Sequence, residues 1–244
     1  MLRLAALLCA ITLPALPQSA LAETALAAVA ANFANAAQTL AAQFQAETGH
    51  LVQITTGSTG KLYAQITQGA PYDLLLSADA ATPARLHADG HGQPQPYAIG
   101  ILTLWAPTQA PNADPKALLQ SDQIRHIAIA NPDLAPYGQA TMAALTAMGL
   151  TKTTKAKIVM GQNIGQTFAL VDSGAAEAGF VARSALTTPK GYVWDVTPSL
   201  YPPIQQDAIL LKHGADNPAA SAFLAYLTTP AARAIIAQSG YGLP

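Results

Sequence analysis

The feature that most constrains the fold of this chain is a repeated alternation between short apolar runs and longer segments of helical period. Runs of strand length are each followed by a segment in which apolar residues recur every three or four positions. In residues 33–47, for example, Phe33, Leu40 and Phe44 fall on one helical face, and Gly49 stands where that helix should end. This alternation predicts an α/β fold, in which parallel sheets are covered by helices on both faces.

The alternation falls into two series separated by segments rich in glycine and proline. We expect strands at 26–30, 51–55, 73–77, 99–105, 127–130, 156–160, 178–182 and 204–211, and helices at 33–47, 60–68, after Asp79, at 137–148, at 166–172 and up to Gln238. The strands at 99–105 and 204–211 lie where the chain would leave a first lobe and return to it. The pattern therefore favours two lobes, residues 23–101 with 207–244 and residues 102–206. One large sheet is the alternative.

The first 22 residues have the organisation of a secretory signal peptide. Arg3 is followed by an apolar run from Leu4 to Leu16, and the segment ends in an Ala-x-Ala pattern at Ala22. Cleavage there would leave a mature chain of residues 23–244. Cys9 is the only cysteine, so the mature chain has no disulfide and depends on its apolar core for stability.

The charge of the mature chain argues against polyanionic partners. Without Arg3 it carries 11 basic and 13 acidic residues, a formal charge of −2. A nucleic-acid partner or an acidic membrane surface would call for a basic surplus, which the sequence lacks.

Neutral segments that precede predicted helices are the strongest indication of a ligand. In residues 55–62, hydroxyl residues and glycines stand between a strand and a helix, where backbone N–H groups are free and the helix dipole favours an anion. Similar neutral segments occur at 30–33, 135–138 and 162–165. Together they predict a pocket that holds an oxyanion by hydrogen bonds rather than by countercharges.

Other interpretations of residues 55–62 are weaker. A P-loop would need a glycine in place of Thr55 and a serine or threonine in place of Leu62. Ser58 and Lys61 match the S-x-x-K of serine acyl-transfer enzymes, but the companion motifs of those enzymes are absent. A capped helix without any ligand is the remaining alternative, and we expect Lys61 on the outer face of that helix.

Two further groups of polar residues are better explained by structure than by chemistry. His87, Asp89 and His91 alternate in a Gly-rich segment without further ligands nearby, which is typical of a surface loop rather than a metal site. Asp73 and Asp79 flank an apolar strand, where we expect them to cap and turn the chain rather than to form an acid–base pair.

At these positions the sequence resembles the periplasmic molybdate-binding proteins of molybdate ABC importers. The resemblance covers nearly all of the mature chain. It depends on residues 30–36 (AANFANA), 57–62 (GSTGKL), 69–79 (GAPYDLLLSAD), 136–138 (PYG), 179–182 (GFVA) and 230–232 (PAA).

The resemblance implies a two-lobed periplasmic-binding-protein fold of type II. Each lobe would hold a mostly parallel sheet flanked by helices, and two hinge crossings would let the lobes close on the ligand. It also implies a non-enzymatic monomer in the periplasm that captures molybdate, and also tungstate, and delivers it to an ABC permease of the inner membrane. No catalytic residue, cofactor or nucleic-acid partner is expected.

Carried over position by position, the resemblance assigns the oxyanion contacts to neutral donors. They are Asn32 with the backbone of Ala31, the pair Ser58 and Thr59, the backbone of Tyr137 and the backbone of Ile164. Molybdenum would be held only through its oxygens, without a direct metal ligand.

The chain departs from the family in two places, since many members have serine at Asn32 and some have tyrosine at Ala182. The amide of Asn32 and the hydroxyl of Tyr137 could replace the missing donors. The alternatives that remain are a receptor for another small oxyanion, such as sulfate or phosphate, and a secreted serine hydrolase using Ser58 and Lys61.

Overall fold

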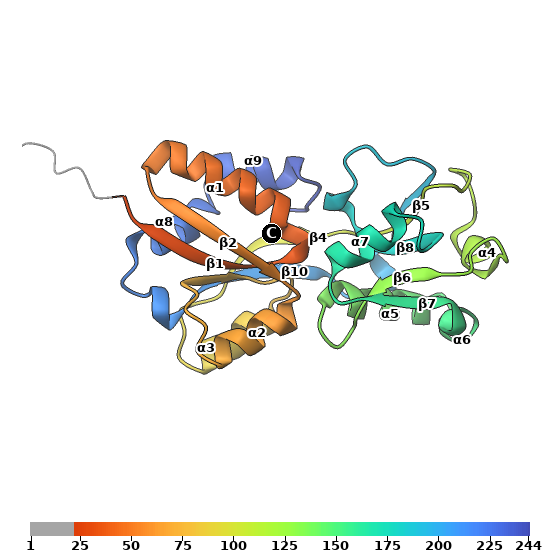
Figure 1. Ribbon diagram of the computed structural model, residues 1–244, viewed down its shortest axis with the longest axis horizontal. Helices are drawn as coiled ribbons and strands as arrows, with labels where there is room; N and C mark the ends of the chain where they lie inside the picture. Colours follow the sequence, from red (N-terminus) through yellow and green to blue (C-terminus); the bar gives the residue numbers. More distant parts are fainter. Residues whose placement is uncertain (1–21) are drawn as a thin grey trace, which may run out of the picture.

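The computed structural model describes residues 22–244. The signal peptide expected at residues 1–22 lies, apart from Ala22, outside the described residues. The described chain forms two lobes that lie side by side along the long axis of the molecule (Figure 1). Each lobe has one five-stranded sheet flanked by helices, which confirms the expected two-lobed α/β fold.

The first lobe combines the N-terminal part of the chain with its C-terminal part. Its strands are β1 (Thr24–Ala30), β2 (Leu51–Gly57), β3 (Leu74–Leu76), β4 (Gln95–Gly100) and β10 (Ile204–Leu210), in the order β2-β1-β3-β10-β4. Its helices are α1 (Ala34–Thr48), α2 (Thr59–Thr67), α3 (Ala81–Ala88), α8 (Pro218–Tyr226) and α9 (Pro230–Gln238), with the 3-10 helices η1 (Ala31–Phe33) and η5 (Lys212–Gly214). Strand β10 is antiparallel to both of its neighbours, so the other four strands share one direction.

The second lobe repeats this arrangement with the middle of the chain. Its strands are β5 (Leu102–Ala106), β6 (Ile127–Ala130), β7 (Ile158–Gly161), β8 (Ala178–Ala182) and β9 (Tyr192–Asp195), in the order β7-β6-β8-β5-β9. Its helices are α4 (Pro115–Gln120), α5 (Pro136–Ala147), α6 (Thr151–Thr154) and α7 (Ile164–Asp172), with the 3-10 helices η2 (Lys155–Lys157), η3 (Arg183–Ala185) and η4 (Pro198–Leu200). Here β5 is the reversed strand, in the same fourth position as β10.

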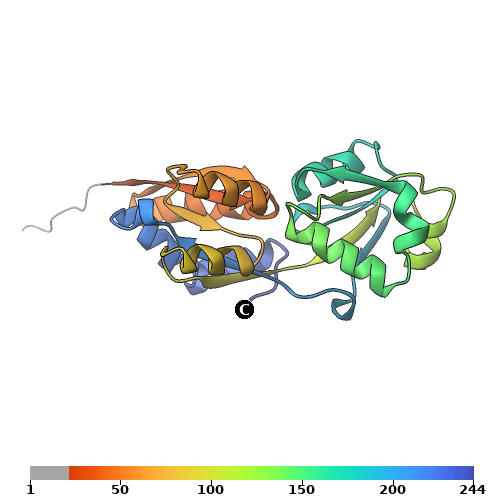
Figure 2. The same cartoon turned by 90° about the horizontal axis from the view of Figure 1, so that it is seen from below.

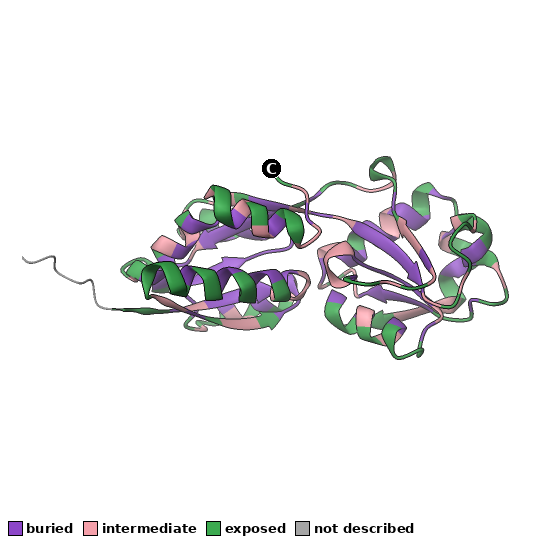
Figure 3. Ribbon diagram, turned by 90° about the horizontal axis from the view of Figure 1, so that it is seen from above, coloured by how far each residue is buried: buried purple, intermediate pink, exposed green. Residues whose placement is uncertain are grey.

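Apolar residues on both faces of each sheet explain why the helices form two outer layers. In β3, Leu74 and Leu76 belong to the core beneath α1, α8 and α9, whereas Leu75 points to the opposite core with Leu62 and Leu86 of α2 and α3. Alternation along the strand thus places apolar side chains on both sides. Figure 3 shows the result, with buried strands between helices whose outer surfaces are exposed.

Helices α8 and α9 close the chain over the first sheet, where Phe223 and Ile236 enter the core shared with α1. Within residues 22–244, no single helix has the length and apolar character needed to cross a membrane. The pair α8 and α9 meets those criteria only when taken together, and it is bent by 67°.

The apolar run at 99–105, expected to be one strand, is two strands in different sheets. Strand β4 ends at Gly100 in the first lobe, and β5 begins at Leu102 in the second. Periodicity could not show this break because the apolar character of the sequence continues across it from Ile99 to Trp105. Strand β4 also starts at Gln95, four residues before the strand start that we expected at Ile99. Pro96 is tolerated there because β4 is an edge strand.

The two crossings between the lobes run beside each other (Figure 2). Gly100 pairs with Ile204 in the first sheet, and Thr103 pairs with Asp195 in the second. Pairing of β10 from Ile204 onward puts residues 204–206 in the first sheet, so the return crossing precedes the expected boundary at 206/207. The sequence analysis also missed α4 and β9, although Asp114 and Pro115 are a cap and a first-turn proline that signal a helix start.

Candidate functional site

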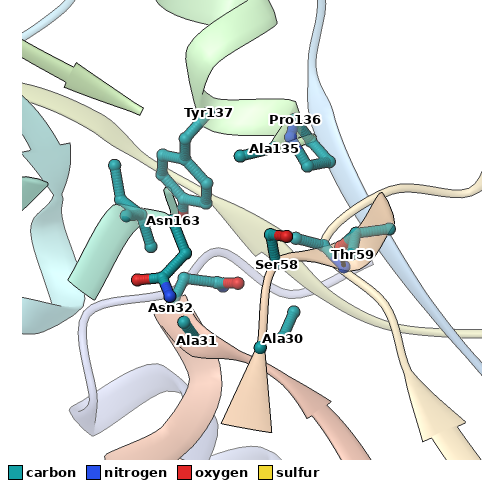
Figure 4. Close-up of a pocket in the computed structure, with 12 residues that line it drawn as sticks. Ala30, Ala31, Asn32, Ser58, Thr59, Ala135, Pro136, Tyr137 and Asn163 are labelled. Carbon is teal, nitrogen blue, oxygen red and sulfur yellow. Dashed lines mark hydrogen bonds between the residues drawn. The ribbon is translucent and has the colours of Figure 1, made fainter. Parts of the chain in front are cut away.

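A small pocket lies between the two lobes (Figure 4). Its lining is uncharged and consists of Ala30, Ala31, Asn32, Gly57, Ser58, Thr59, Ala78, Ala135, Pro136, Tyr137, Asn163 and Ile164. The structure therefore brings together all six residues expected at the site: Ala31, Asn32, Ser58, Thr59, Tyr137 and Ile164. The space between the lining atoms, including the part open to solvent, is about 200 Å³, so the pocket suits only a small ligand.

Four helical segments begin at this pocket, each directly after or soon after a parallel strand. They are η1 leading into α1, α2 after β2, α5 after β6, and α7 after β7. Backbone N–H groups in a first helical turn have no acceptor within the helix, and the aligned peptide dipoles give that end a partial positive charge. The N–H groups of Asn32, Thr59, Tyr137 and Ile164 occupy such first turns. The pocket is thus electropositive without a cation.

Ser58 and Thr59 place two hydroxyl groups in the pocket, and both residues are buried. Ser58 Oγ accepts a hydrogen bond from the N–H of Lys61 at 3.4 Å, which caps α2. Thr59 Oγ1 accepts from the N–H of Ala78 at 3.1 Å. Since each oxygen already accepts from the backbone, each hydroxyl proton remains available for donation to a ligand.

The side-chain amide of Asn32 is engaged by protein groups. Its Nδ2 donates to Gln206 Oε1 at 2.9 Å and to the hydroxyl of Tyr241 at 3.3 Å. The backbone carbonyl oxygen of Asn32 accepts from Ser184 Oγ at 3.2 Å. The amide was expected to replace the serine hydroxyl of other family members, but both of its hydrogens are already bonded. What Asn32 offers to a ligand is its backbone N–H.

Tyr137 is almost fully buried, with its ring reaching from α5 toward the Asn32 side of the pocket (Figure 4). Burial raises the pKa of its hydroxyl well above the ordinary value of tyrosine, against a lowering by the side chains of Gln206 and Asn32. The phenol therefore stays neutral at physiological pH. Gly138, the next residue, is required by packing, because a Cβ there would overlap the carbonyl oxygen of Ala130.

Asn163 is a pocket residue that the sequence analysis did not single out. Its Oδ1 accepts from the N–H of Gln166 at 2.9 Å and so caps α7, whose first residue is Ile164. The signal was present in the sequence, since asparagine is a preferred N-cap and lies in the neutral segment 162–165.

The remaining candidates lie outside the pocket. Lys61 is exposed on α2 and is not a lining residue. His87 lies in the last turn of α3, with its Nδ1 3.0 Å from the carbonyl oxygen of Gly92, so the loop expected for all three residues begins only at Asp89. His91 Nδ1, in that loop, accepts from the N–H of Lys212 at 3.0 Å. Residues 22–244 contain no group of His, Cys, Asp and Glu side chains that could hold a metal ion.

Both aspartates that flank β3 bond to the backbone. Asp79 Oδ1 accepts from the N–H of Thr82 at 2.8 Å at the start of α3. Asp73 Oδ2 accepts from the N–H of Leu26 at 2.7 Å, while its Oδ1 lies 2.8 Å from His213 Nδ1. These bonds are the capping and turning role expected from the sequence.

Comparison with known proteins gives a consistent result. The family model of the bacterial extracellular solute-binding proteins matches residues 25–242. The molybdate-binding protein ModA of Azotobacter vinelandii is 43% identical over 223 residues, which cover 88% of each chain. That of Rhodobacter capsulatus is 43% identical over 220 residues, which cover 88% of this chain and 87% of the relative.

A solved structure shares the whole fold. The periplasmic molybdate-binding protein of Azotobacter vinelandii superposes with a TM-score of 0.85 at 38% identity. The superposition covers 90% of this chain and 99% of the other, so the two lobes and their crossings have close counterparts there.

Proposed function

The chain belongs to the bacterial extracellular solute-binding protein family, and from this premise we propose that it captures molybdate between its lobes and delivers it to an ABC importer. The observation that carries the proposal is the uncharged pocket in which four helical N-termini and the hydroxyls of Ser58 and Thr59 converge. We assign the contacts to Ser58, Thr59 and the backbone N–H groups of Ala31, Asn32, Tyr137 and Ile164.

The donor set favours a fully ionised anion. Every polar group assigned to the ligand donates a hydrogen bond, and the lining holds no carboxylate that could accept a proton from the ligand. Phosphate carries a proton near neutral pH and would leave it unpaired, whereas molybdate, tungstate and sulfate are acceptors at all four oxygens. Neutral donors suit such dianions because the charge is spread over the oxygens and faces helix N-termini.

The donors alone do not separate molybdate from sulfate, which has the same charge and shape but shorter bonds. The names of the relatives at 43% identity support the larger anion. We expect tungstate to bind as well, because its size and charge match those of molybdate.

The remaining features of the proposal follow from the family. The protein acts in the periplasm after removal of residues 1–22, as a monomer, with the permease of the inner membrane and the oxyanion as its partners. It is not an enzyme and does not bind nucleic acid. The hydrolase alternative loses support because Lys61 is exposed and lies outside the pocket, so it is not placed to activate Ser58.

Isothermal titration of residues 23–244 with molybdate, tungstate, sulfate and phosphate tests the proposal. We expect saturable one-to-one binding of molybdate and tungstate, with much weaker binding of sulfate and phosphate. Tight binding of sulfate without a response to molybdate would overturn the assignment and leave a receptor for another oxyanion.

A further inference from the structure

Three buried polar atoms without hydrogen-bond partners meet behind the pocket. Within residues 22–244, the side-chain polar atoms that are buried and unpaired are Asn32 Oδ1, Tyr137 Oη, Gln206 Nε2 and, elsewhere, Tyr226 Oη. The first three are an acceptor, a hydroxyl that can both donate and accept, and a donor. Buried polar groups are paired in the great majority of native structures, so an unpaired set of complementary groups needs an explanation.

The three atoms come from different parts of the molecule. Asn32 belongs to η1 of the first lobe, Tyr137 to α5 of the second lobe, and Gln206 to β10, which begins just after the return crossing. Asn32 and Gln206 are already joined by the 2.9 Å bond from Asn32 Nδ2 to Gln206 Oε1. Tyr137 is therefore the member that changes position when the lobes separate.

Gln206 is held in place by a second buried hydroxyl. Tyr97 Oη lies 3.0 Å from Gln206 Oε1 and 2.9 Å from the carbonyl oxygen of Ser77. Because Tyr97 and Asn32 both bond to Oε1, the orientation of the Gln206 side chain is fixed. Its Nε2 then points away from these two residues, toward Gly100.

The surroundings of Gly100 place the Tyr137 hydroxyl beside Gln206 Nε2. A Cβ built on Gly100 would overlap Tyr137 Oη and lie 2.7 Å from Gln206 Nε2. Gly100 does not have a positive φ angle, so its backbone conformation does not call for glycine. Glycine is needed at this last residue of β4 because the absence of a side chain leaves space for the Tyr137 hydroxyl from the other lobe.

From this geometry we infer, resting on the proposed function, that Tyr137 Oη fastens the closed lobes by donating to Asn32 Oδ1 and accepting from Gln206 Nε2. We call Asn32, Tyr137 and Gln206 the interlobe latch. Tyr137 then has two separate roles, with its backbone N–H toward the anion and its hydroxyl toward the latch. The hydroxyl is a positioning group that favours the closed state and slows release of the ligand without touching it.

The variant Tyr137→Phe tests the latch because it removes one oxygen and keeps the ring. We expect on the order of a tenfold loss of molybdate affinity, carried mainly by faster dissociation, as measured by stopped-flow fluorescence and calorimetry. An unchanged dissociation rate would overturn the latch while leaving the proposed function intact. Absence of molybdate binding by the unmodified protein would instead overturn the proposed function.

A double-mutant cycle separates the latch from a direct contact between the hydroxyl and the anion. A Gln206→Met background removes one of the two latch bonds and also the acceptor that holds Asn32 Nδ2 in place, so Tyr137→Phe should cost less affinity there than in the unmodified protein. Equal losses in both backgrounds would show that the hydroxyl binds the anion directly and would refute the latch. The melting temperature of each variant identifies any that fails to fold.

A ligand-free measurement completes the test. Spin labels at exposed positions of the two lobes, Gln43 of α1 and Thr146 of α5, report the closed fraction by their distance distribution. The latch predicts a smaller closed fraction in Tyr137→Phe than in the unmodified protein, whichever anion is the natural ligand. Identical distributions, with and without ligand, would contradict it.

Discussion

The two lobes have the same strand order but offer the ligand different chemistry. The first lobe presents the hydroxyls of Ser58 and Thr59 together with backbone N–H groups. The second presents backbone N–H groups beside apolar side chains, and its one polar side chain in the lining, Asn163, caps α7. Donors on side chains can be exchanged by substitution, but donors on the backbone depend on where a helix starts. If the proposed contacts hold, selectivity can be changed residue by residue in the first lobe, whereas in the second lobe it depends on the position of the backbone.

The largest loss of molybdate affinity is expected from a substitution that displaces the backbone of the second lobe at the pocket. In Gly138→Ala the new Cβ would overlap the carbonyl oxygen of Ala130 and lie 2.8 Å from the nitrogen of Pro132, so the start of α5 must shift. The shift withdraws the N–H of Tyr137, and we expect molybdate affinity to fall about a hundredfold or more.

Calorimetry measures this loss, and circular dichroism checks that the variant is folded. The matched control is Gly174→Asn, at a glycine with φ of +76° and open space around it, which should leave affinity unchanged. Normal affinity in Gly138→Ala would mean that the second lobe does not bind through the start of α5.

A smaller loss should follow removal of one hydroxyl from the first lobe. Thr59→Ala deletes a donor to a charged ligand, a bond that contributes roughly 1.5–3 kcal/mol. We expect about a tenfold to a hundredfold weaker affinity for molybdate by titration. Thr67→Ala, at the exposed end of the same helix, is the control and should bind normally. If Thr59→Ala binds as well as the control does, the hydroxyl is not a ligand contact.

Loss of the α7 cap should lower molybdate affinity less than loss of the Thr59 hydroxyl. Asn163→Ala removes the acceptor for the N–H of Gln166, and such caps typically contribute about 1 kcal/mol, so affinity should fall about fivefold. Asn163→Ser keeps a capping oxygen and should restore most of the affinity. Equal losses in both variants would indicate that the amide of Asn163 itself contacts the ligand.

The smallest effect is expected at Lys61, the charge nearest in sequence to the first-lobe hydroxyls. Its side chain is exposed on α2, where water and salt screen its interaction with the pocket. Lys61→Ala should change affinity by less than about twofold at moderate salt, because exposed charges contribute little. If this variant lost binding while Thr59→Ala kept it, a countercharge rather than neutral donors would hold the anion.

The sequence was most informative where local rules decide the structure. Ser58 and Asn163 cap their helices at 3.4 Å and 2.9 Å through contacts three residues apart, so their neutral segments identified the helix starts that line the pocket. The outline of both sheets followed from apolar periodicity in the same way. These features depend on neighbours along the chain, which a single sequence displays.

Contacts between residues far apart in the sequence could not be predicted from the sequence alone. The bond from Asn32 to Gln206 joins residues 174 positions apart, and no local pattern shows that this amide is already occupied. The need for glycine at position 100 depends on Tyr137 in the other lobe, which arrives there only in the folded chain. The break at Ile101 was missed for a related reason, since the change of sheet leaves no mark on periodicity.

The crossings have a mechanical consequence that follows from the strand order. Each crossing leads from an edge strand of one sheet, β4 or β9, into a strand of the other sheet that is bonded on both sides, β5 or β10. We therefore expect any bending to be concentrated in a few backbone dihedrals around Ile101 and Tyr201–Pro203, so that the lobes rotate relative to each other as rigid bodies. Under the proposed function, binding of the anion would set the angle between the lobes, and a membrane partner that touches both lobes could sense that angle without contacting the anion.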